Sequence, residues 1–73
     1  MHKVISGFDL VKFLTKKGFE IYSRKGSHVK LISHERKTKT IIPMHKEISK
    51  GTLNSILKQA KLSDEEINEL FES

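Results

Sequence analysis

The tripeptide Gly26-Ser27-His28 stands between two strand-like runs of the chain, with basic residues on both sides. Arg24 and Lys25 precede it, and Lys30 follows it. An imidazole takes up and releases protons near neutral pH, because its unperturbed pKa is about 6.5. A histidine beside a tight turn and among lysines therefore suits acid–base chemistry on a polyanion. The same tripeptide is also compatible with a plain turn that exposes a histidine.

The residues around this histidine each have two interpretations. Lys30 is either a group that stabilises developing negative charge or a solvated strand lysine. Ser27 either orients the reacting group or shapes the turn, and Gly26 permits a positive φ or a close backbone approach. Arg24 and Lys25 are placed at the turn to hold a phosphate.

Two further histidines follow later in the chain. His45 ends the run Pro43-Met44-His45, and it is either a second acid–base group or a residue that positions a loop. His34 lies in a charged segment, where we expect it to be exposed. These residues lack the close ligand spacing of a zinc site, and the chain has no cysteine, so we expect no metal. No glycine-rich phosphate loop is present, and no cofactor is expected.

The charge of the chain is unevenly distributed. Residues 1–61 contain all 14 basic residues and four acidic ones, a net charge of +10. Residues 62–73 contain five acidic residues and no basic one, a net charge of −5. A body of such positive charge attracts phosphate backbones, which favours a nucleic acid as the partner.

Hydrophobic spacing predicts three helices around a group of strands. Residues 7–17 form an amphipathic helix, with Ser6 as N-cap and Gly18 as the left-handed stop. A second helix begins near 49–51 and continues to Ala60. A capping box at 63–66 starts a short C-terminal helix.

Three strands are predicted between the first two helices, at 19–24, 28–32 and 38–42, with 25–27 as the first turn. Short connections make them an antiparallel meander. If Val29 and Leu31 face the core, His28 and Lys30 share the opposite, exposed face, because side chains alternate along a strand. The fold class is therefore α+β.

The size and composition of the chain set limits on its organisation. We expect residues 1–73 to form a single domain with a small core. No apolar run approaches the roughly 18 residues of a membrane span. The start of the chain lacks the apolar stretch of a signal peptide. We therefore expect a soluble, cytoplasmic protein with no membrane partner.

Four blocks of sequence, in this order and spacing, carry a resemblance to a known family. They are Gly18-Phe19, Gly26-Ser27-His28, Pro43-Met44-His45, and the run from Gly51-Thr52-Leu53 to Ala60 with Leu62-Ser63 after it. The chain resembles the HicA (YcfA-like) family, the toxins of HicA–HicB toxin–antitoxin systems, over about residues 6–71. One departure is the turn before the third strand, 34–37, which lacks the glycine that the family often has there.

The resemblance implies a double-stranded-RNA-binding-domain-like α-β-β-β-α fold, with a three-stranded antiparallel sheet and a short C-terminal helix. It also implies a type II toxin that cleaves mRNA and is neutralised by a HicB-like antitoxin covering the active site. The family's functional histidine corresponds to His28, and we expect a metal-independent endoribonuclease. The alternatives are a non-catalytic RNA-binding module of the same fold, and a protein whose basic face serves only to bind a partner protein. The oligomeric state is not predicted.

Overall fold

The computed structural model describes residues 4–72, so residues 1–3 and 73 of the predicted domain 1–73 lie outside the described residues. The elements are α1 (Gly7–Lys16), β1 (Glu20–Lys25), β2 (His28–Ser33), β3 (Thr38–Pro43), α2 (Lys50–Gln59) and α3 (Asp64–Glu72). The strands form one antiparallel sheet in the order β1-β2-β3, which confirms the predicted α+β order. No helix among residues 4–72 has the length and apolar character needed to cross a membrane.

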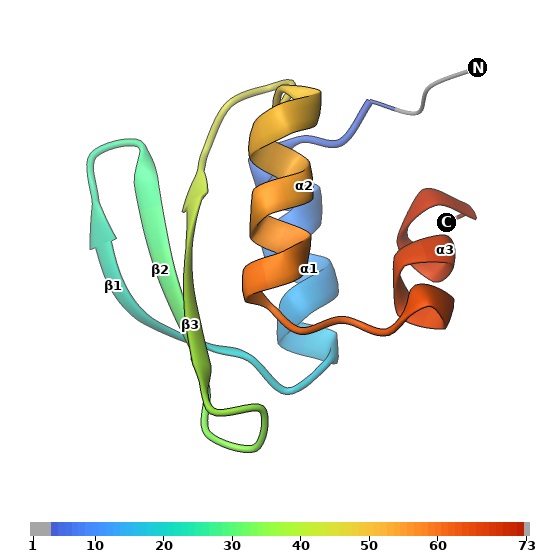
Figure 1. Ribbon diagram of the computed structural model, residues 1–73. Coiled ribbons are helices and arrows are strands. Elements are labelled where there is room, and N and C mark those ends of the chain that lie inside the picture. The colour runs from blue at the N-terminus through green and yellow to red at the C-terminus, as the bar shows by residue number, and fades with distance from the viewer. Residues whose placement is uncertain (1–3, 73) are drawn as a thin grey trace.

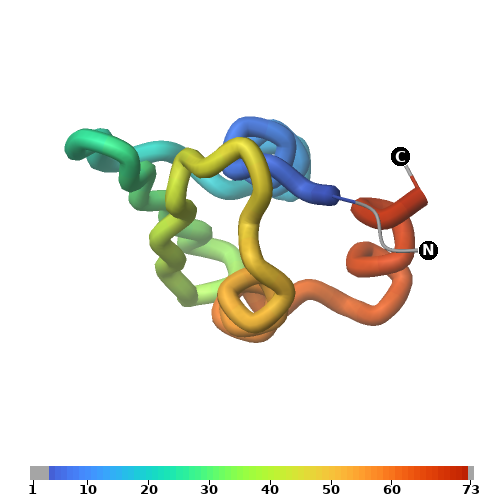
Figure 2. Tube along the Cα trace, turned by 90° about the horizontal axis from the view of Figure 1, so that it is seen from above, coloured from blue at the N-terminus to red at the C-terminus, as the bar shows by residue number. Residues whose placement is uncertain are grey.

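The elements are stacked in layers (Figures 1 and 2). Helices α1 and α2 lie side by side against one face of the sheet, and α3 lies on their far side, away from the sheet. The β1–β2 turn, the loop after β3 and the first turns of α1 and α2 all lie toward one end of the molecule. That end contains the histidine motif, and we call it the His28 end.

Helix α1 begins and ends as its sequence predicts. The Ser6 hydroxyl accepts a hydrogen bond from the Asp9 amide at 3.0 Å, which satisfies one free N–H of the first turn. At the other end Gly18 has φ +95°, and the Phe19 amide donates to the Leu14 carbonyl at 3.0 Å, as in a Schellman motif. The Phe19 amide is thus used by the helix end, so β1 begins at Glu20, one residue later than predicted. The helix stops at Lys16, with Lys17 as its C-cap.

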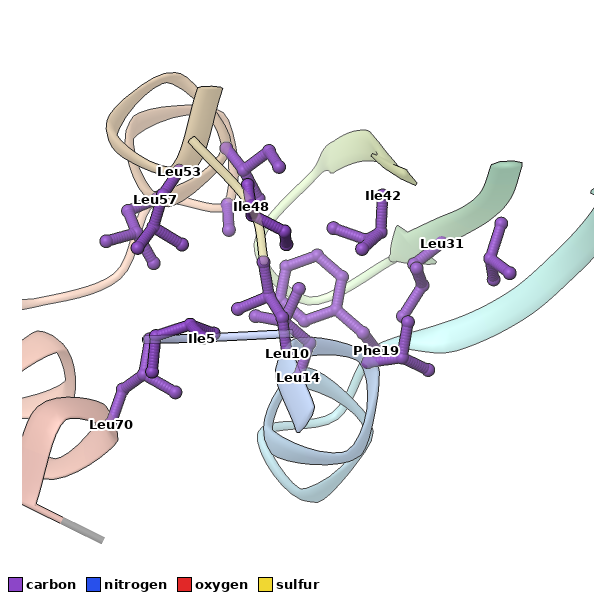
Figure 3. Packing of buried hydrophobic residues seen from close by; sticks show 14 residues of the cluster. Ile5, Leu10, Leu14, Phe19, Leu31, Ile42, Ile48, Leu53, Leu57 and Leu70 are labelled. Atoms are coloured by element: carbon purple, nitrogen blue, oxygen red, sulfur yellow. The ribbon is translucent and has the colours of Figure 1, made fainter. Parts of the chain in front are cut away.

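The core lies between the sheet and the two central helices, and it extends to α3 through Leu70 (Figure 3). Leu10, Leu14, Leu31 and Ile42 have no exposed surface. Two polar residues in this layer are satisfied: Ser33 accepts from the Arg36 amide at 3.1 Å, and the Thr40 hydroxyl donates to the Gln59 side-chain oxygen at 2.9 Å. The buried hydrophobic residues are Ile5, Leu10, Val11, Leu14, Phe19, Val29, Leu31, Ile42, Ile48, Leu53, Ile56, Leu57, Ala60 and Leu70.

Arg36, in the β2–β3 loop, attaches α3 to the rest of the molecule. Its guanidinium donates two hydrogen bonds to the Glu66 carboxylate, at 2.9 and 2.6 Å, and a third to the Lys61 carbonyl at 3.2 Å. Glu66 also accepts from the Ser63 amide in the predicted capping box. The hydrogen bonds from Arg36 lower the pKa of Glu66 from 4.5 to about 2.

Candidate active site

The Gly26-Ser27-His28 motif forms the tip of the β1–β2 hairpin. Lys25 is paired with His28, so the connection is the two-residue loop Gly26-Ser27, and Lys25 belongs to β1 rather than to the predicted turn. Gly26 has φ +56°, a conformation that a glycine at the first loop position adopts without steric cost. No atom lies within 4 Å of a Cβ built on Gly26, so its requirement is the backbone angle and not a close approach.

The side chains of β2 alternate as predicted. Val29 and Leu31 are 5% and 0% exposed and face the helices, whereas His28 is exposed and Lys30 is half-buried on the other face. Lys25 is the direct cross-strand partner of His28, so their side chains lie on the same face. The structure therefore brings Lys25, His28 and Lys30 together on the outer face of the sheet, at its end.

Arg24 lies on the opposite face. The register shifts between Ile21 and Ser23, which leaves Tyr22 as the extra residue of a β-bulge in β1. After the bulge Ser23 pairs with Lys30, and Arg24 pairs with the buried Val29. Arg24 is exposed, but it shares the side of the sheet that faces the helices, and it is not grouped with His28.

The run Pro43-Met44-His45 is attached to the histidine motif by backbone contacts. Pro43 is the cross-strand partner of His28 in β3, and the Met44 amide donates to the Ser27 carbonyl at 2.6 Å. The His45 carbonyl in turn accepts from the Gly7 amide at 2.9 Å. The main chain of His45 therefore fixes the loop to α1, and its side chain is exposed.

Gly7 allows the start of α1 to approach this loop. A Cβ added at Gly7 would overlap the Pro43 carbonyl oxygen and would lie 2.7 Å from the Met44 Cα. Neither approach is possible for a real side chain, so only glycine fits there. α1, the loop after β3 and the hairpin tip are thus joined by one strand pairing, two backbone hydrogen bonds and the close packing of Gly7 against Pro43.

Two lysines near the site were not singled out from the sequence. Lys46 lies in the loop after β3 and Lys50 is the first residue of α2, both exposed in the segment that runs over the His28 end (Figure 2). The N-terminal ends of α1 and α2 also point to this end, and their partial positive charges add to the field there. The excess of basic residues was visible in the sequence, but their location depends on the path of the loop.

The other predicted site residues have simple environments. Ser27 is exposed in the turn and contributes its carbonyl to Met44, which agrees with a role in shaping the turn. His34 is exposed in the β2–β3 loop, at the opposite end of β2 from His28. Within residues 4–72 no three His, Asp or Glu side chains gather as a metal site would require.

The chain is similar to a known protein family. The model of the family described as HicA toxin of bacterial toxin-antitoxin matches residues 7–62, more than half of the chain. The match runs from the start of α1 past the end of α2, and it includes every residue of the candidate site, whereas α3 lies beyond it. No curated protein matches the chain.

Proposed function

The chain belongs to the HicA toxin family of bacterial toxin–antitoxin systems, and from this we propose that it is an endoribonuclease that cleaves mRNA with His28 as its acid–base group. Toxins of this family are known as mRNA interferases. Membership also implies an antitoxin as a partner.

The observation that carries the proposal is the position of His28. Its side chain is exposed at the end of β2, with Lys25 directly across the hairpin and Lys30 two residues along on the same face. An acid–base group beside two cations is the arrangement that a phosphodiester needs, because a proton must move while negative charge develops on the phosphate oxygens.

RNA supplies its own nucleophile for this reaction. His28 takes the proton of a 2′-hydroxyl, the 2′-oxygen attacks the adjacent phosphorus, and the bond from phosphorus to the 5′-oxygen breaks. The products are a 2′,3′-cyclic phosphate and a 5′-hydroxyl, after the leaving oxygen has received a proton. Positioned proton transfer of this kind contributes ~10²–10⁴-fold to a rate. The route uses neither a metal nor a cofactor, and it spares DNA, which lacks the 2′-hydroxyl.

The other residues of the site have supporting roles in this proposal. Lys30 stabilises the charge that develops on the phosphate, and Lys25 and Arg24 bind the RNA backbone on either side of the hairpin tip. Gly26 and Ser27 give the tip the shape that presents His28. His45 has the other exposed imidazole of the predicted site, and it is the candidate proton donor to the leaving oxygen. Its substitution is tested below.

We assign the antitoxin the same surface. A HicB-like protein that lies over the outer face of the sheet end would shield His28, Lys25 and Lys30 together from RNA. The positive charge of residues 1–61 favours an acidic partner surface there. An mRNA substrate and an antitoxin partner support a cytoplasmic location for this activity.

The decisive experiment compares His28→Ala with His34→Ala. Both are exposed histidines beside β2, but they stand at opposite ends of the strand. We expect growth arrest and loss of intact mRNA on induction of the wild type and of His34→Ala, and neither effect with His28→Ala. Equal toxicity of the two variants would refute the role of His28.

Purified protein separates cleavage from binding. Wild-type protein in EDTA should convert RNA into fragments with 2′,3′-cyclic phosphate ends, and loss of activity on chelation would contradict the metal-independent route. Binding of RNA by the wild type without cleavage would support the alternative of a non-catalytic RNA-binding module. His45→Ala should lower the cleavage rate more than it weakens RNA binding if its imidazole is the acid, and it should leave both unchanged if only its main chain is used.

A further inference from the structure

Phe8 is the most exposed large hydrophobic residue among those described, at 63%. It lies in the first turn of α1, whose residues Gly7, Leu10 and Val11 are buried. A chain of 73 residues has few large apolar side chains for its core. A phenylalanine that is exposed to solvent at this position contributes little to the stability of the fold. The residues around it therefore show whether it can bind a ligand.

A cation accompanies the ring. The Lys12 ammonium lies over the Phe8 ring, 5.5 Å from its centroid, one helical turn further along α1. Lys12 is itself exposed, so the pair presents an aromatic surface and a positive charge side by side. Aromatic rings next to basic groups are the elements from which single-stranded nucleic-acid sites are built.

The backbone at Phe8 is held near that of His28 by the contacts of the candidate site. Phe8 follows Gly7, whose backbone packs against the Pro43 carbonyl, and Pro43 is the cross-strand partner of His28. Phe8 is adjacent to Gly7 in the chain, Gly7 is packed against Pro43, and Pro43 is paired with His28. The Cα–Cα distances of these three steps limit the separation between the Cα atoms of Phe8 and His28 to roughly 15 Å. Since Gly7 leaves no clearance against the loop, this separation is fixed by the fold and not by a flexible linker.

Two other aromatic residues of the described chain are exposed, Phe71 and Tyr22, and neither lies in the segments that meet at the His28 end. Phe71, 38% exposed, lies on α3, a helix with four glutamates, one aspartate and no basic residue, so the charge of its helix repels phosphate. Tyr22 lies at the bulge of β1, with its ring against Lys39 of β3. Phe8 is the exposed aromatic residue that belongs to the His28 end. Its acidic neighbour Asp9 lies in the first turn of α1, where the helix dipole partly offsets the negative charge.

We propose that Phe8 and Lys12 form a platform on which an unpaired RNA base next to the cleavage site stacks, with the Lys12 ammonium on the neighbouring phosphate. The platform makes substrate recognition favour single-stranded RNA, because a base can lie on Phe8 only when it is not held in a duplex. This inference rests on the proposed function, in which RNA is cleaved at His28.

Fluorescence tests the contact directly, because the chain has no tryptophan. Phe8→Trp and, as a matched control, Phe71→Trp each introduce a single indole at an exposed position, in the His28→Ala background so that the RNA stays intact. A short single-stranded RNA of mixed sequence should quench the indole emission of Phe8→Trp in a saturable way and leave that of Phe71→Trp unchanged. A duplex of the same sequence should quench the Phe8→Trp emission less.

Cleavage kinetics test the consequence in protein with His28 intact. Phe8→Ala should lower kcat/KM about five- to 150-fold, the range that stacking of one base on an aromatic ring supplies. Phe8→Tyr should keep most of the activity, Phe8→Leu should lower kcat/KM about as much as Phe8→Ala, and Phe71→Ala should match the wild type. The salt dependence of binding should become shallower in Lys12→Ala and stay the same in Phe8→Ala.

The outcomes distinguish this inference from the function on which it rests. Cleavage by the wild type, with no quenching of the Phe8→Trp variant and normal kinetics for Phe8→Ala, would overturn the platform and leave the nuclease in place. Equal quenching of the Phe8→Trp and Phe71→Trp variants would also overturn it, since it would mean non-specific binding. If the protein with His28 neither binds nor cleaves RNA, the proposed function fails and the platform fails with it.

Discussion

The tightest contact of the fold predicts opposite effects for the same substitution at two glycines. Gly7 and Gly51 both lie in the first turn of a helix, α1 and α2 respectively. A Cβ at Gly7 would overlap the Pro43 carbonyl oxygen and lie 2.7 Å from the Met44 Cα, whereas a Cβ at Gly51 meets nothing within 4 Å. Alanine is therefore a steric insertion at one position and a gain in helix propensity at the other.

The magnitude follows from these contacts. Real Cβ contacts are essentially never shorter than 3.0 Å, so the 2.7 Å approach to Met44 alone requires α1 and the loop after β3 to separate, and the overlap with Pro43 requires more. Overpacking of this kind costs about 1–3 kcal/mol, and a weakened hydrogen bond from Gly7 to His45 adds about 1 kcal/mol. Helix propensity returns less than about 1 kcal/mol. The net loss is about 1–3 kcal/mol, while Gly51→Ala gains up to about 1 kcal/mol.

Thermal unfolding followed by circular dichroism checks both values. A change of about 1 kcal/mol shifts Tm by about 4–8 °C in a domain of this size. Gly7→Ala should therefore lower Tm by roughly 5–20 °C, and Gly51→Ala should raise it by a few degrees. The RNA cleavage rate of Gly7→Ala, measured well below its Tm, should also fall, because the loop that carries Pro43 moves relative to His28. An unchanged Tm for Gly7→Ala would refute the close packing.

Two further predictions concern α3 and the end of α2. The folded pKa of Glu66, about 2, lies below its ordinary 4.5, so its ion pair with Arg36 stabilises the protein above pH 4.5, and this stability is lost as the pH falls toward 2. Glu66→Gln should lower the free energy of unfolding by about 1–2 kcal/mol at neutral pH, after allowance for solvent screening, and should change it little near pH 2. Urea denaturation at the two pH values measures both losses of stability, and equal losses would contradict the prediction. Lys61 follows α2 with φ +56°, a left-handed conformation that glycine adopts more easily than lysine. Lys61→Gly should therefore stabilise the protein by about 0.5–1 kcal/mol. Lys58→Gly, within α2, should instead destabilise it by about 1 kcal/mol, because glycine has a low helix propensity. Chemical denaturation of the two lysine variants compares the signs, and a loss of stability in both would show that the left-handed position carries no strain.

Features that depend on neighbouring residues in the chain could be predicted from the sequence. The Ser6 cap, the Gly18 stop and the capping box at Ser63 each involve groups three to five residues apart, and all three are confirmed. The exposed face of His28 is a consequence of strand alternation, and it is also confirmed. The order of elements follows because each hydrophobic pattern is local.

Features that depend on contacts between distant segments could not be predicted. The bulge at Tyr22 reverses the face of Arg24, and it is defined only when β1 is aligned with β2. Lys37 has φ +54° in the turn where a glycine was missing, so a lysine adopts the left-handed position there. Arg36 bonds to Glu66, 30 residues away, and no local pattern marks it as the residue that anchors α3.

The position of α3 keeps the acidic end of the described chain away from the histidine motif. Residues 62–73 carry a charge of −5, enough to oppose half the positive charge of the remainder if they lay over the site. Instead α3 lies beyond α1 and α2, and its ion pairs are with Lys17 and Arg36, near the ends of α1 and of β2 that are remote from the histidine motif. α3 thus does not lie over the segments that form the His28 end, and Lys25, Lys46 and Lys50, which lie in or next to those segments, are exposed. Within residues 4–72, α3 therefore does not neutralise this face, which is the face that we propose for the antitoxin.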